Sequence, residues 1–301
     1  MKYVVTGGAG FIGSNLVDRL VKDECEVHVI DNFLTGKQEN CNPGATYHNI
    51  DLSDDSNFVK IVKILKKVDT VFHLACIARV QPSIEDPIKY EINNTIGLVN
   101  MLKASVDSKV RRFIYSSSSS VYGNNSKTPQ KESFTANPIS PYAAQKLYGE
   151  ILCKTFSAVY NIETISLRYF NVYGEKQNIR GAYSLVIGIF LNQMLTNKPL
   201  TIRGSGKQRR DFTYVGDVVE ANILASKVQI NSNEIINIGN GDNRSINDIA
   251  SYIGGNIDYI DSVIEPLETL ADNSKAKKLL NWEPTQDVES WIKKHLKERH
   301  E

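Results

Sequence analysis

A cluster of glycines near the start of the chain restricts its possible folds more than any other feature. Gly7, Gly10 and Gly13 fall within TGGAGFIGS, between an apolar run at residues 3–5 and an amphipathic run that begins at Phe11. Glycine costs backbone entropy, so three in seven residues need a local reason. In a turn from a buried strand into a helix they allow a tight turn, a close approach to phosphates and helix–strand packing. The stretch therefore indicates a dinucleotide site, although a turn without a ligand could carry the same pattern.

Short β-branched runs alternate with longer amphipathic runs through the first half of the chain. We expect strands at residues 2–6, 26–31, 46–51, 70–75, 111–117, 164–170 and 235–239. We expect helices between them, for example at about 54–66 and 84–105. Strand–helix alternation with nearly continuous apolar strands predicts an α/β fold, a doubly wound parallel sheet of the Rossmann type.

The alternation weakens after about Phe170, where turn-rich segments begin. We predict a dinucleotide-binding domain at residues 1–170, with 215–241 returning to it. Residues 171–214 and 242–301 are predicted to form a smaller, discontinuous lid over the carboxyl ends of the strands.

Charge and cysteine content argue against several other classes. The formal net charge is +1, and the basic run at residues 207–210 is too short to attract nucleic acid. The four cysteines show no metal-ligand spacing, the five histidines do not cluster, and no apolar stretch is long enough to span a bilayer. We expect a cytoplasmic protein with reduced thiols, no metal, no nucleic-acid partner and no membrane partner.

The second expected strand, EVHVID, ends in an acidic residue. Asp31 follows Gly13 by 18 residues, close to the spacing of about 20 at which an acid binds an adenosine ribose. A carboxylate accepts hydrogen bonds from a 2′-hydroxyl and repels a 2′-phosphate, and no arginine follows directly. The position favours NAD over NADP, while the alternative is an ordinary turn aspartate.

The stretch SPYAAQK carries a candidate acid–base pair. Ser140 suits an N-cap and Pro141 the first helical position, so Tyr142 and Lys146 share one helix face. Lowering the pKa of a tyrosine to near 7 requires roughly 4 kcal/mol of preferential phenolate stabilisation. A nearby ammonium and the positive nicotinamide of NAD⁺ could supply much of it, although many helices carry this pair without function.

Five consecutive serines, Ser116 to Ser120, follow the fifth expected strand. A flexible linker is the alternative, but residues 113–115 run straight into the serines and 121–123 close them. The run therefore falls at the carboxyl edge of the sheet, where doubly wound folds bind ligands. One hydroxyl there could share a proton with a substrate hydroxyl and Tyr142.

Eight motifs then carry a family resemblance: TGGAGFIGS, DNFLTG, FHLA, YSSSSSVYG, SPYAAQK, LRYFNVYG, RRDFTYV and ADNSKAKKLLNW. Over essentially its whole length the chain resembles the extended short-chain dehydrogenases/reductases of the NAD-dependent epimerase/dehydratase family, most of all the UDP-sugar 4-epimerases. The resemblance implies that Ser118, Tyr142 and Lys146 are catalytic. It implies contacts with NAD from Gly7, Gly10, Phe11, Ile12, Gly13, Asp31, Asn32, Asp51, Leu52, Leu74, Ala75, Asn94, Ser116, Tyr142, Lys146 and Tyr169. It implies contacts with the UDP-sugar from Arg79, Ser118, Tyr142, Asn171, Arg210 and Thr269.

The chemistry implied by the resemblance is redox without net redox. Tyr142, assisted by Ser118, removes the proton of the sugar 4-hydroxyl while the C4 hydride moves to NAD⁺. The resulting 4-keto sugar turns over and takes the hydride back on its other face. Family dehydratases and decarboxylases carry carboxylates where this chain has Ser119 and Ser120, which disfavours lyase activity. UDP-glucuronate 4-epimerase stays open as an alternative, with Arg79 and Arg180 as candidate partners of the substrate carboxylate.

Sugar preference and nucleotide binding depend on the segment EPLETLADNSKA. The resemblance places Thr269 beside C2 of the hexose, where a small residue admits an N-acetyl group. We therefore expect interconversion of UDP-GlcNAc and UDP-GalNAc as well as of UDP-Glc and UDP-Gal. Relatives carry a diphosphate-binding arginine about seven residues earlier, which is absent here; Lys207 or Arg209 could replace it.

Two further expectations concern assembly and catalytic competence. Relatives pair through two helices per subunit, which match residues 84–105 and 141–160 here, so the resemblance implies a homodimer. A non-catalytic NAD-binding protein of this fold is the alternative from another functional class. The presence of Ser118, Tyr142 and Lys146 argues against it.

Overall fold

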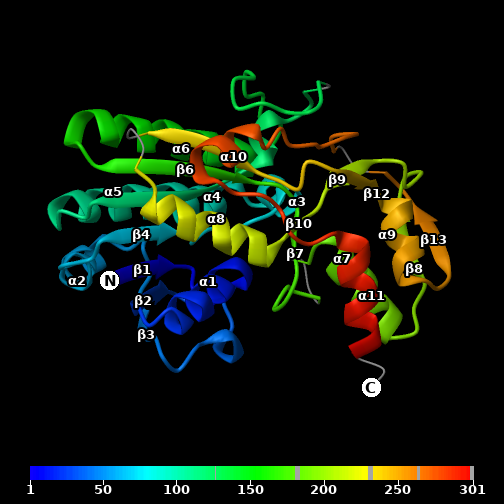
Figure 1. Ribbon diagram of the computed structural model, residues 1–301, viewed down its shortest axis with the longest axis horizontal. Coiled ribbons are helices and arrows are strands. Elements are labelled where there is room, and N and C mark those ends of the chain that lie inside the picture. Colours follow the sequence, from blue (N-terminus) through cyan, green and yellow to red (C-terminus); the bar gives the residue numbers. More distant parts are fainter. Residues whose placement is uncertain (126, 180–183, 230–232, 263–264, 299–301) are drawn as a thin grey trace.

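Seven parallel strands form the central sheet of the molecule, which Figure 1 shows as a computed structural model. The structure describes residues 1–125, 127–179, 184–229, 233–262 and 265–298. The strands of the sheet are β1 (Lys2–Thr6), β2 (Glu26–Asp31), β3 (Thr46–Asn49), β4 (Thr70–His73), β5 (Arg112–Ser118), β6 (Glu163–Tyr169) and β11 (Glu234–Ile238). Their order is β3-β2-β1-β4-β5-β6-β11, and every neighbouring pair is parallel. The predicted doubly wound sheet is confirmed.

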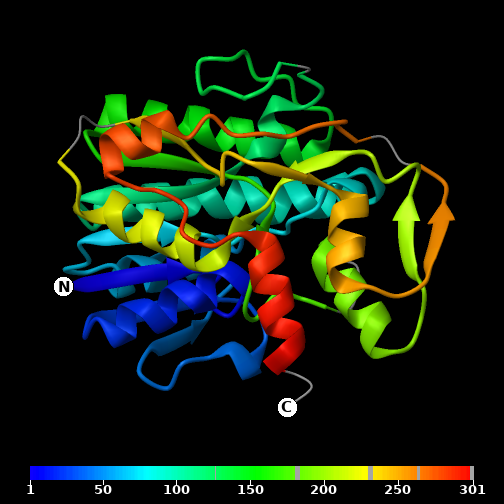
Figure 2. The same cartoon turned by 45° about the vertical axis from the view of Figure 1, so that its right-hand side comes forward.

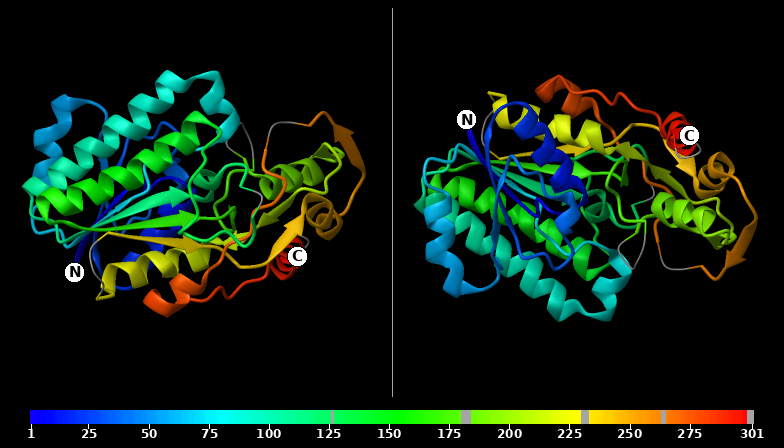
Figure 3. Two further views of the ribbon diagram at one scale, coloured as in Figure 1. Left: turned by 90° about the horizontal axis from the view of Figure 1, so that it is seen from above. Right: turned by 90° about the horizontal axis from the view of Figure 1, so that it is seen from below.

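Helices cover both faces of this sheet (Figure 3). One face carries α1 (Phe11–Lys22), α8 (Val215–Lys227) and α10 (Ser274–Leu280), and the other α2 (Phe58–Ile64), α5 (Gly97–Asp107) and α6 (Pro141–Tyr160). Alternate strand residues point to opposite faces: Tyr3 and Val5 join one apolar cluster, whereas Val4 joins the other. Burial on both faces explains why the strands read as continuous apolar runs.

The helix expected at 84–105 is divided into several pieces. They are α3 (Val80–Glu85), α4 (Pro87–Glu91), the π-helical turn η3 (Ile92–Ile96) and α5. Asp86 caps α4 by accepting a hydrogen bond from the Lys89 backbone, and Pro87 takes its first position. A new helix therefore begins at Pro87, because proline cannot continue the preceding one. The remaining single turns are η1 (Gln38–Asn40), η2 (Asp55–Asn57) and η4 (Ser119–Tyr122).

A second region lies beyond the carboxyl ends of the strands (Figure 2). It contains α7 (Val186–Leu195), α9 (Ile246–Ile253) and α11 (Val288–Glu298), with the parallel pair β8 (Leu200–Arg203) and β13 (Ile257–Ile260). The three helices and β8 share their own apolar cluster, whereas β13 is exposed. Two further pairs join the regions: β7 (Val172–Tyr173) with β10 (Thr213–Tyr214), and β9 (Arg209–Asp211) with β12 (Asn243–Ser245).

Part of the segment assigned to the lid packs on the sheet instead. Ala276 and Leu280 of α10 lie in the same apolar cluster as β11 and α8. Trp282 is buried there too, and its Nε1 donates a hydrogen bond to the Asp217 carbonyl at 2.8 Å. Residues 242–301 are thus not all lid, because the apolar face of α10 completes the cover of the outermost strand.

The described part of the chain has neither a membrane-spanning helix nor a metal-ligating cluster. None of the described helices combines the length and the apolar character that a membrane span requires. The described residues hold no cluster of three or more metal-ligating side chains. All four cysteines are free thiols.

Candidate active site

A cavity of about 670 Å³ lies at the carboxyl edge of the sheet, with walls from the sheet and from the second region. Nearly every predicted site residue lines it: Gly7, Gly10, Phe11, Ile12, Gly13, Asp31, Asn32, Asp51, Leu52, Leu74, Ala75, Arg79, Ser116, Ser118, Tyr142, Tyr169, Asn171, Arg210 and Thr269. Lys146 and Asn94 lie behind the wall as buried side chains. Arg180, a candidate for a substrate carboxylate, lies outside the described residues.

The glycine turn between β1 and α1 forms one end of the cavity. Gly7 has φ +70°, and a Cβ there would lie 2.8 Å from the Ala75 nitrogen. A Cβ at Gly13 would lie 2.2 Å from the Gly7 oxygen. Gly10 precedes α1 without any side-chain cap, which leaves the first N–H groups of the helix available for an anion. This cradle fits a dinucleotide pyrophosphate.

Asp31 ends β2 beside that turn. Its Oδ2 accepts a hydrogen bond from the Ala9 backbone at 2.9 Å, and its Oδ1 accepts one from Phe33 at 2.8 Å. Asn32 donates through Nδ2 to Asp51 at 3.2 Å. Asp31 thus holds the glycine turn in place, and its carboxylate forms part of the cavity wall.

The predicted catalytic helix is present with its predicted cap. Ser140 accepts a hydrogen bond from the Ala143 backbone, and α6 begins at Pro141. Lys146 donates through Nζ to the Ser116 carbonyl at 2.6 Å, and this ammonium lies 5.8 Å from the centre of the Tyr142 ring. The cap and the helical spacing bring Tyr142, Lys146 and the end of β5 together.

The serine run is ordered and belongs to strand and helix rather than to a linker. Ser116 and Ser117 are buried in β5, and Ser118 ends the strand. The Ser118 hydroxyl accepts a hydrogen bond from the Ser120 backbone at 3.1 Å, and it lies close enough to Tyr142 to lower the pKa of that phenol. Ser118 and Tyr142 therefore present adjacent hydroxyls to the cavity.

Electrostatics at this centre depend on groups from several elements. Burial raises the pKa of Tyr142 above its ordinary value, whereas the Ser118 hydrogen bond and the Arg79 guanidinium lower it. Burial lowers the pKa of Lys146, but Cys76, Tyr115 and Glu150 together raise it above its ordinary value. Lys146 is therefore charged, and without ligands Tyr142 is a neutral phenol.

Cys76 and Arg79 share the loop after β4, and sequence reasoning missed the first of them. Cys76 lines the cavity and lies close enough to Lys146 to raise the pKa of that ammonium. Arg79 has φ +126°, a strained value for a residue with a side chain. Only one signal in the sequence could have identified Cys76. This residue follows a parallel strand closely and so falls at the sheet edge where ligands bind.

Asn94 supports the cavity wall from behind. Its Oδ1 accepts from the Ile77 nitrogen at 2.7 Å, and its Nδ2 donates to the Ile77 carbonyl at 3.0 Å and to Gln145 Oε1 at 3.0 Å. Gln145 in turn donates to Glu91. Asn94 thus ties the loop after β4 to the residue beside Lys146.

A buried ion pair holds α6 against the sheet. Arg168 of β6 donates to both carboxylate oxygens of Glu150, at 2.8 and 2.7 Å. Ser117 donates to the same carboxylate at 2.5 Å, and the Arg168 guanidinium lies over the Tyr122 ring. These contacts fix the helix of Tyr142 relative to the strand of Ser118.

The other end of the cavity is built around Asp211. Its carboxylate accepts from the backbones of Asn240, Gly241 and Ala271 at 2.7 to 3.0 Å, although burial raises its pKa to about 6. Thr269 Oγ1 accepts from Asn171 Nδ2 and from the Asp211 nitrogen, both at 3.2 Å. Thr269 is therefore fixed in the wall, and its small side chain leaves the adjacent space open.

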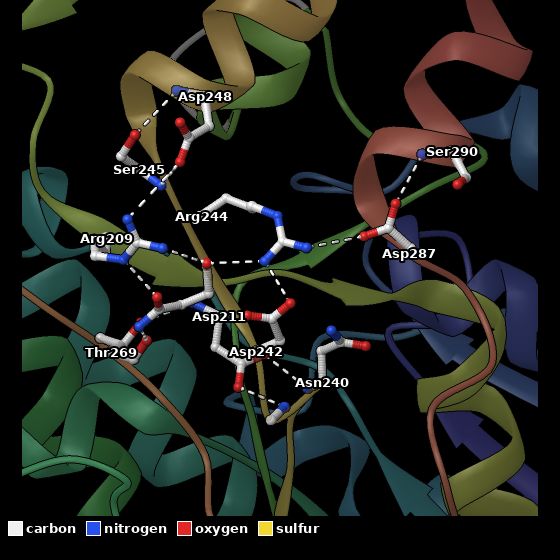
Figure 4. A network of polar contacts seen from close by, with 12 residues as sticks. Arg209, Asp211, Asn240, Asp242, Arg244, Ser245, Asp248, Thr269, Asp287 and Ser290 are labelled. Atoms are coloured by element: carbon white, nitrogen blue, oxygen red, sulfur yellow. Dashed lines mark hydrogen bonds and ion pairs between the residues drawn. The ribbon is translucent and has the colours of Figure 1, made fainter.

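Figure 4 shows how the neighbouring Arg209 is engaged. Its guanidinium donates to the side chain and carbonyl of Asn243 and lies 3.9 Å from Asp248. Arg209 and Lys207 line a separate hollow beside the main cavity. Arg210 faces the main cavity and is ion-paired with Glu265, a residue that the sequence analysis did not identify.

Comparison with protein families and known proteins adds an independent observation. Residues 3–239 match the model of a family described as "NAD dependent epimerase/dehydratase family". The chain is 38% identical over 299 residues to a putative UDP-glucose 4-epimerase of Methanocaldococcus jannaschii, covering 97% of this chain and 96% of the relative.

Two solved structures are similar along nearly the whole chain. One is the UDP-N-acetylglucosamine 4-epimerase of Methanobrevibacter ruminantium M1 in complex with UDP-N-acetylmuramic acid: 37% identity, TM-score 0.92, covering 98% of this chain and 97% of that one. The other is the UDP-glucuronic acid 4-epimerase of Bacillus cereus in complex with UDP-glucuronic acid and NAD: 35% identity, TM-score 0.90, covering 99% and 100%. These relatives differ in their sugars, so the similarity does not select one sugar for this chain.

Proposed function

We propose that this chain, which belongs to the NAD-dependent epimerase/dehydratase family, is a 4-epimerase of UDP-hexoses that accepts both UDP-GlcNAc and UDP-Glc. The observation that supports it most directly is the adjacency of Ser118 and Tyr142 at one cavity that also holds the glycine cradle. At one end of the cavity the cradle favours binding of a dinucleotide, and at the other end the lid favours binding of a nucleotide sugar.

The roles of the chain's own residues follow from their positions. Tyr142 is the group that takes the proton of the sugar 4-hydroxyl and returns it. Ser118 donates a hydrogen bond that orients that hydroxyl, and Arg79 lowers the pKa of Tyr142. NAD, when bound in the cradle, supplies hydride acceptance and return. Lys146, charged and anchored on Ser116, stabilises the phenolate.

Thr269 supports the wide sugar range. It is small, buried and held by Asn171 and Asp211, so the space beside it stays open for an N-acetyl group. A bulkier residue in this position would occupy that space.

UDP-glucuronate 4-epimerase is the second candidate, and Arg79 is the observation that favours it. This guanidinium lines the cavity close enough to Tyr142 to affect its pKa. A cation beside the reacting centre could pair with a sugar carboxylate.

A product assay separates the two candidates. The purified protein receives UDP-GlcNAc, UDP-Glc or UDP-glucuronate, and the 4-epimers are resolved by chromatography, with and without added NAD. We expect UDP-GalNAc and UDP-Gal. Conversion of UDP-glucuronate alone would transfer the assignment to the second candidate, and no product from any of the three would refute both.

The Tyr142→Phe substitution tests catalytic competence. Removing the hydroxyl that exchanges the proton should reduce turnover at least about 1,000-fold, because general acid–base catalysis contributes about 10²–10⁴-fold and the positioned hydroxyl is lost with it. UDP-sugar binding, measured by calorimetry, should change little. A variant that keeps its turnover would assign the proton transfer to another group, and a wild type that binds NAD without any turnover would favour a sensor.

We also infer that the protein is a homodimer. The helices expected to pair, α4 with η3 and α6, expose large apolar side chains, among them Ile88, Ile92, Tyr148 and Ile151. Contact between two copies would remove these groups from water.

A further inference from the structure

The buried ammonium of Lys146 lies near two aromatic rings. Its Nζ is 5.0 Å from the centre of the Tyr115 ring and 5.8 Å from the centre of the Tyr142 ring. Lys146 and Tyr115 are both almost fully buried. An ammonium that has lost its water needs other partners to stay charged, and the electron-rich face of an aromatic ring is such a partner.

The ring of Tyr115 packs closely against the helix that carries Lys146. Tyr115 belongs to β5 and Gly149 to α6, and a Cβ at Gly149 would lie 2.2 Å from the Tyr115 hydroxyl oxygen and 2.4 Å from its Cζ. Any side chain at residue 149 would therefore push the ring away. Residues 146 and 149 lie on the same face of the helix, one turn apart, so the glycine lets the ring approach the face that carries Lys146.

The residue after Tyr115 holds the same ammonium. The Ser116 carbonyl accepts a hydrogen bond from Lys146 Nζ at 2.6 Å, so neighbouring positions of β5 supply a carbonyl and a ring face. Burial raises the pKa of Tyr115 above its ordinary value. Tyr115 is therefore a neutral phenol, and it contributes through its ring rather than as an anion.

We propose that Tyr115 is a positioning residue that keeps the Lys146 ammonium charged and within reach of Tyr142. This rests on the proposed function, in which Tyr142 exchanges the proton of the sugar 4-hydroxyl. Tyr115 lies behind the cavity wall and acts through Lys146. Without the ring, the ammonium stabilises the Tyr142 phenolate less well, and the base becomes available only at higher pH.

Other titratable groups also face Lys146 and Tyr142. His73 comes from β4, Cys76 and Arg79 from the loop after it, and Glu150 from α6. All four stay unchanged when Tyr115 is substituted. A difference between Tyr115 variants in the titration of Tyr142 therefore reports on the ring.

The test compares the wild type with Tyr115→Leu, Tyr115→Phe and Phe113→Leu. Tyr115→Leu removes the ring, whereas Tyr115→Phe removes only the hydroxyl. Phe113→Leu is the matched control, because Phe113 is a fully buried ring two positions earlier on the same strand and in the same apolar cluster. UDP-sugar turnover is measured against pH, and the titration of Tyr142 is followed by phenolate absorbance with NAD added. Tyr142→Phe supplies the blank for that absorbance.

Tyr115→Leu should raise the midpoint of the Tyr142 titration, and the acidic limb of the turnover profile, by about one pH unit. Its turnover should fall about tenfold at neutral pH and recover toward the wild-type value as the pH rises. Tyr115→Phe and Phe113→Leu should keep the wild-type midpoint. A merely structural loss would instead lower turnover equally at every pH.

An unchanged midpoint in Tyr115→Leu would overturn the inference, as would an equal change in Phe113→Leu, which would indicate a general loosening of the strand. If circular dichroism shows that Tyr115→Leu does not fold, Tyr115→Met replaces it under the same criteria, because methionine fills irregular space. Turnover of the wild type separates this from the proposed function. Turnover without the change in midpoint refutes the role of Tyr115 alone. The change in the phenolate titration without any turnover refutes the epimerase and leaves the role of Tyr115 in place.

Discussion

Thr269 has a structural role in the cavity wall, and under the proposed function it also sets the substrate range. Its hydroxyl joins Asn171 to the Asp211 backbone, and its side chain lines the cavity. Substitutions of Thr269 can therefore change the size of the side chain and its hydrogen bonds separately.

Thr269→Tyr should close the space beside the sugar. We expect kcat/KM for UDP-GlcNAc to fall about 100-fold, a steric loss of about 2.7 kcal/mol, and that for UDP-Glc to fall less than about tenfold. Thr269→Ser keeps the hydroxyl and is the control that should retain both activities. Equal losses for the two sugars in the tyrosine variant would mean that Thr269 does not face C2.

Individual site residues were predictable to different extents. Gly7, Asp31, Tyr142 and Lys146 could be identified because each is defined by local spacing along one strand–turn–helix unit or one helix. Glu265 could not, because its ion pair with Arg210 forms only where its loop meets β9 in the folded chain.

At the scale of elements, the buried pair Glu150–Arg168 sets the position of α6. Both side chains are almost fully buried, so neither charge can be screened by water if the other is removed. The pair thereby couples the catalytic helix to β6.

Glu150→Gln should lower the free energy of unfolding by about 3 kcal/mol or more, because it leaves the Arg168 charge buried without a counter-ion. Urea denaturation measures this. The double variant Glu150→Leu with Arg168→Met removes both charges and should recover most of the loss. A single variant as stable as wild type would show that the pair contributes little.

The exposed apolar helices give a prediction about assembly. Ile88→Glu combined with Ile151→Glu should convert a dimer to a monomer in light scattering, because two charges would be buried in an apolar contact. Val59→Glu on α2 is the control, since Val59 is equally exposed but lies on another helix. A dimer that survives the double substitution would place its interface elsewhere.

The elements were more predictable than their ends. All seven expected strands of the central sheet begin within one residue of the observed ones, since apolar runs mark buried parallel strands clearly. The β5 serines could also be placed at the sheet edge. The sequence analysis expected one continuous helix at 84–105. Pro87 was the signal in the sequence that this helix is interrupted, because proline begins a new helix there.

At the scale of the whole molecule, stability should depend on pH through buried titratable groups. Burial lowers the pKa of His73 to about 3, and the Lys146 charge contributes. An unfolded histidine has a pKa near 6.5. The unfolded chain therefore takes up a proton that the folded chain excludes, and stability falls as pH drops from about 6.5 to 3.

His73→Phe should flatten this dependence, with a difference of at most about 5 kcal/mol across the window. The neighbouring rings of Phe113 and Tyr115 can accept a phenyl group. Urea unfolding at several pH values, with wild type and variant compared at each, measures the slope. The comparison is needed because Asp211, with its pKa raised to about 6 by burial, acts in the opposite direction between about pH 4 and 6. Parallel curves for the two proteins would exclude His73 as the source.

The chain passes between the two regions several times, and this limits how the lid could be exchanged between relatives during evolution. Elements of the lid alternate in sequence with α8, β11 and α10, which complete the sheet. No single cut and splice could exchange the lid for that of a relative, because separate stretches would have to be transplanted together. Under the proposed function, new substrate preferences are therefore accessible through point substitutions at cavity-facing positions such as Thr269, rather than through recombination of modules.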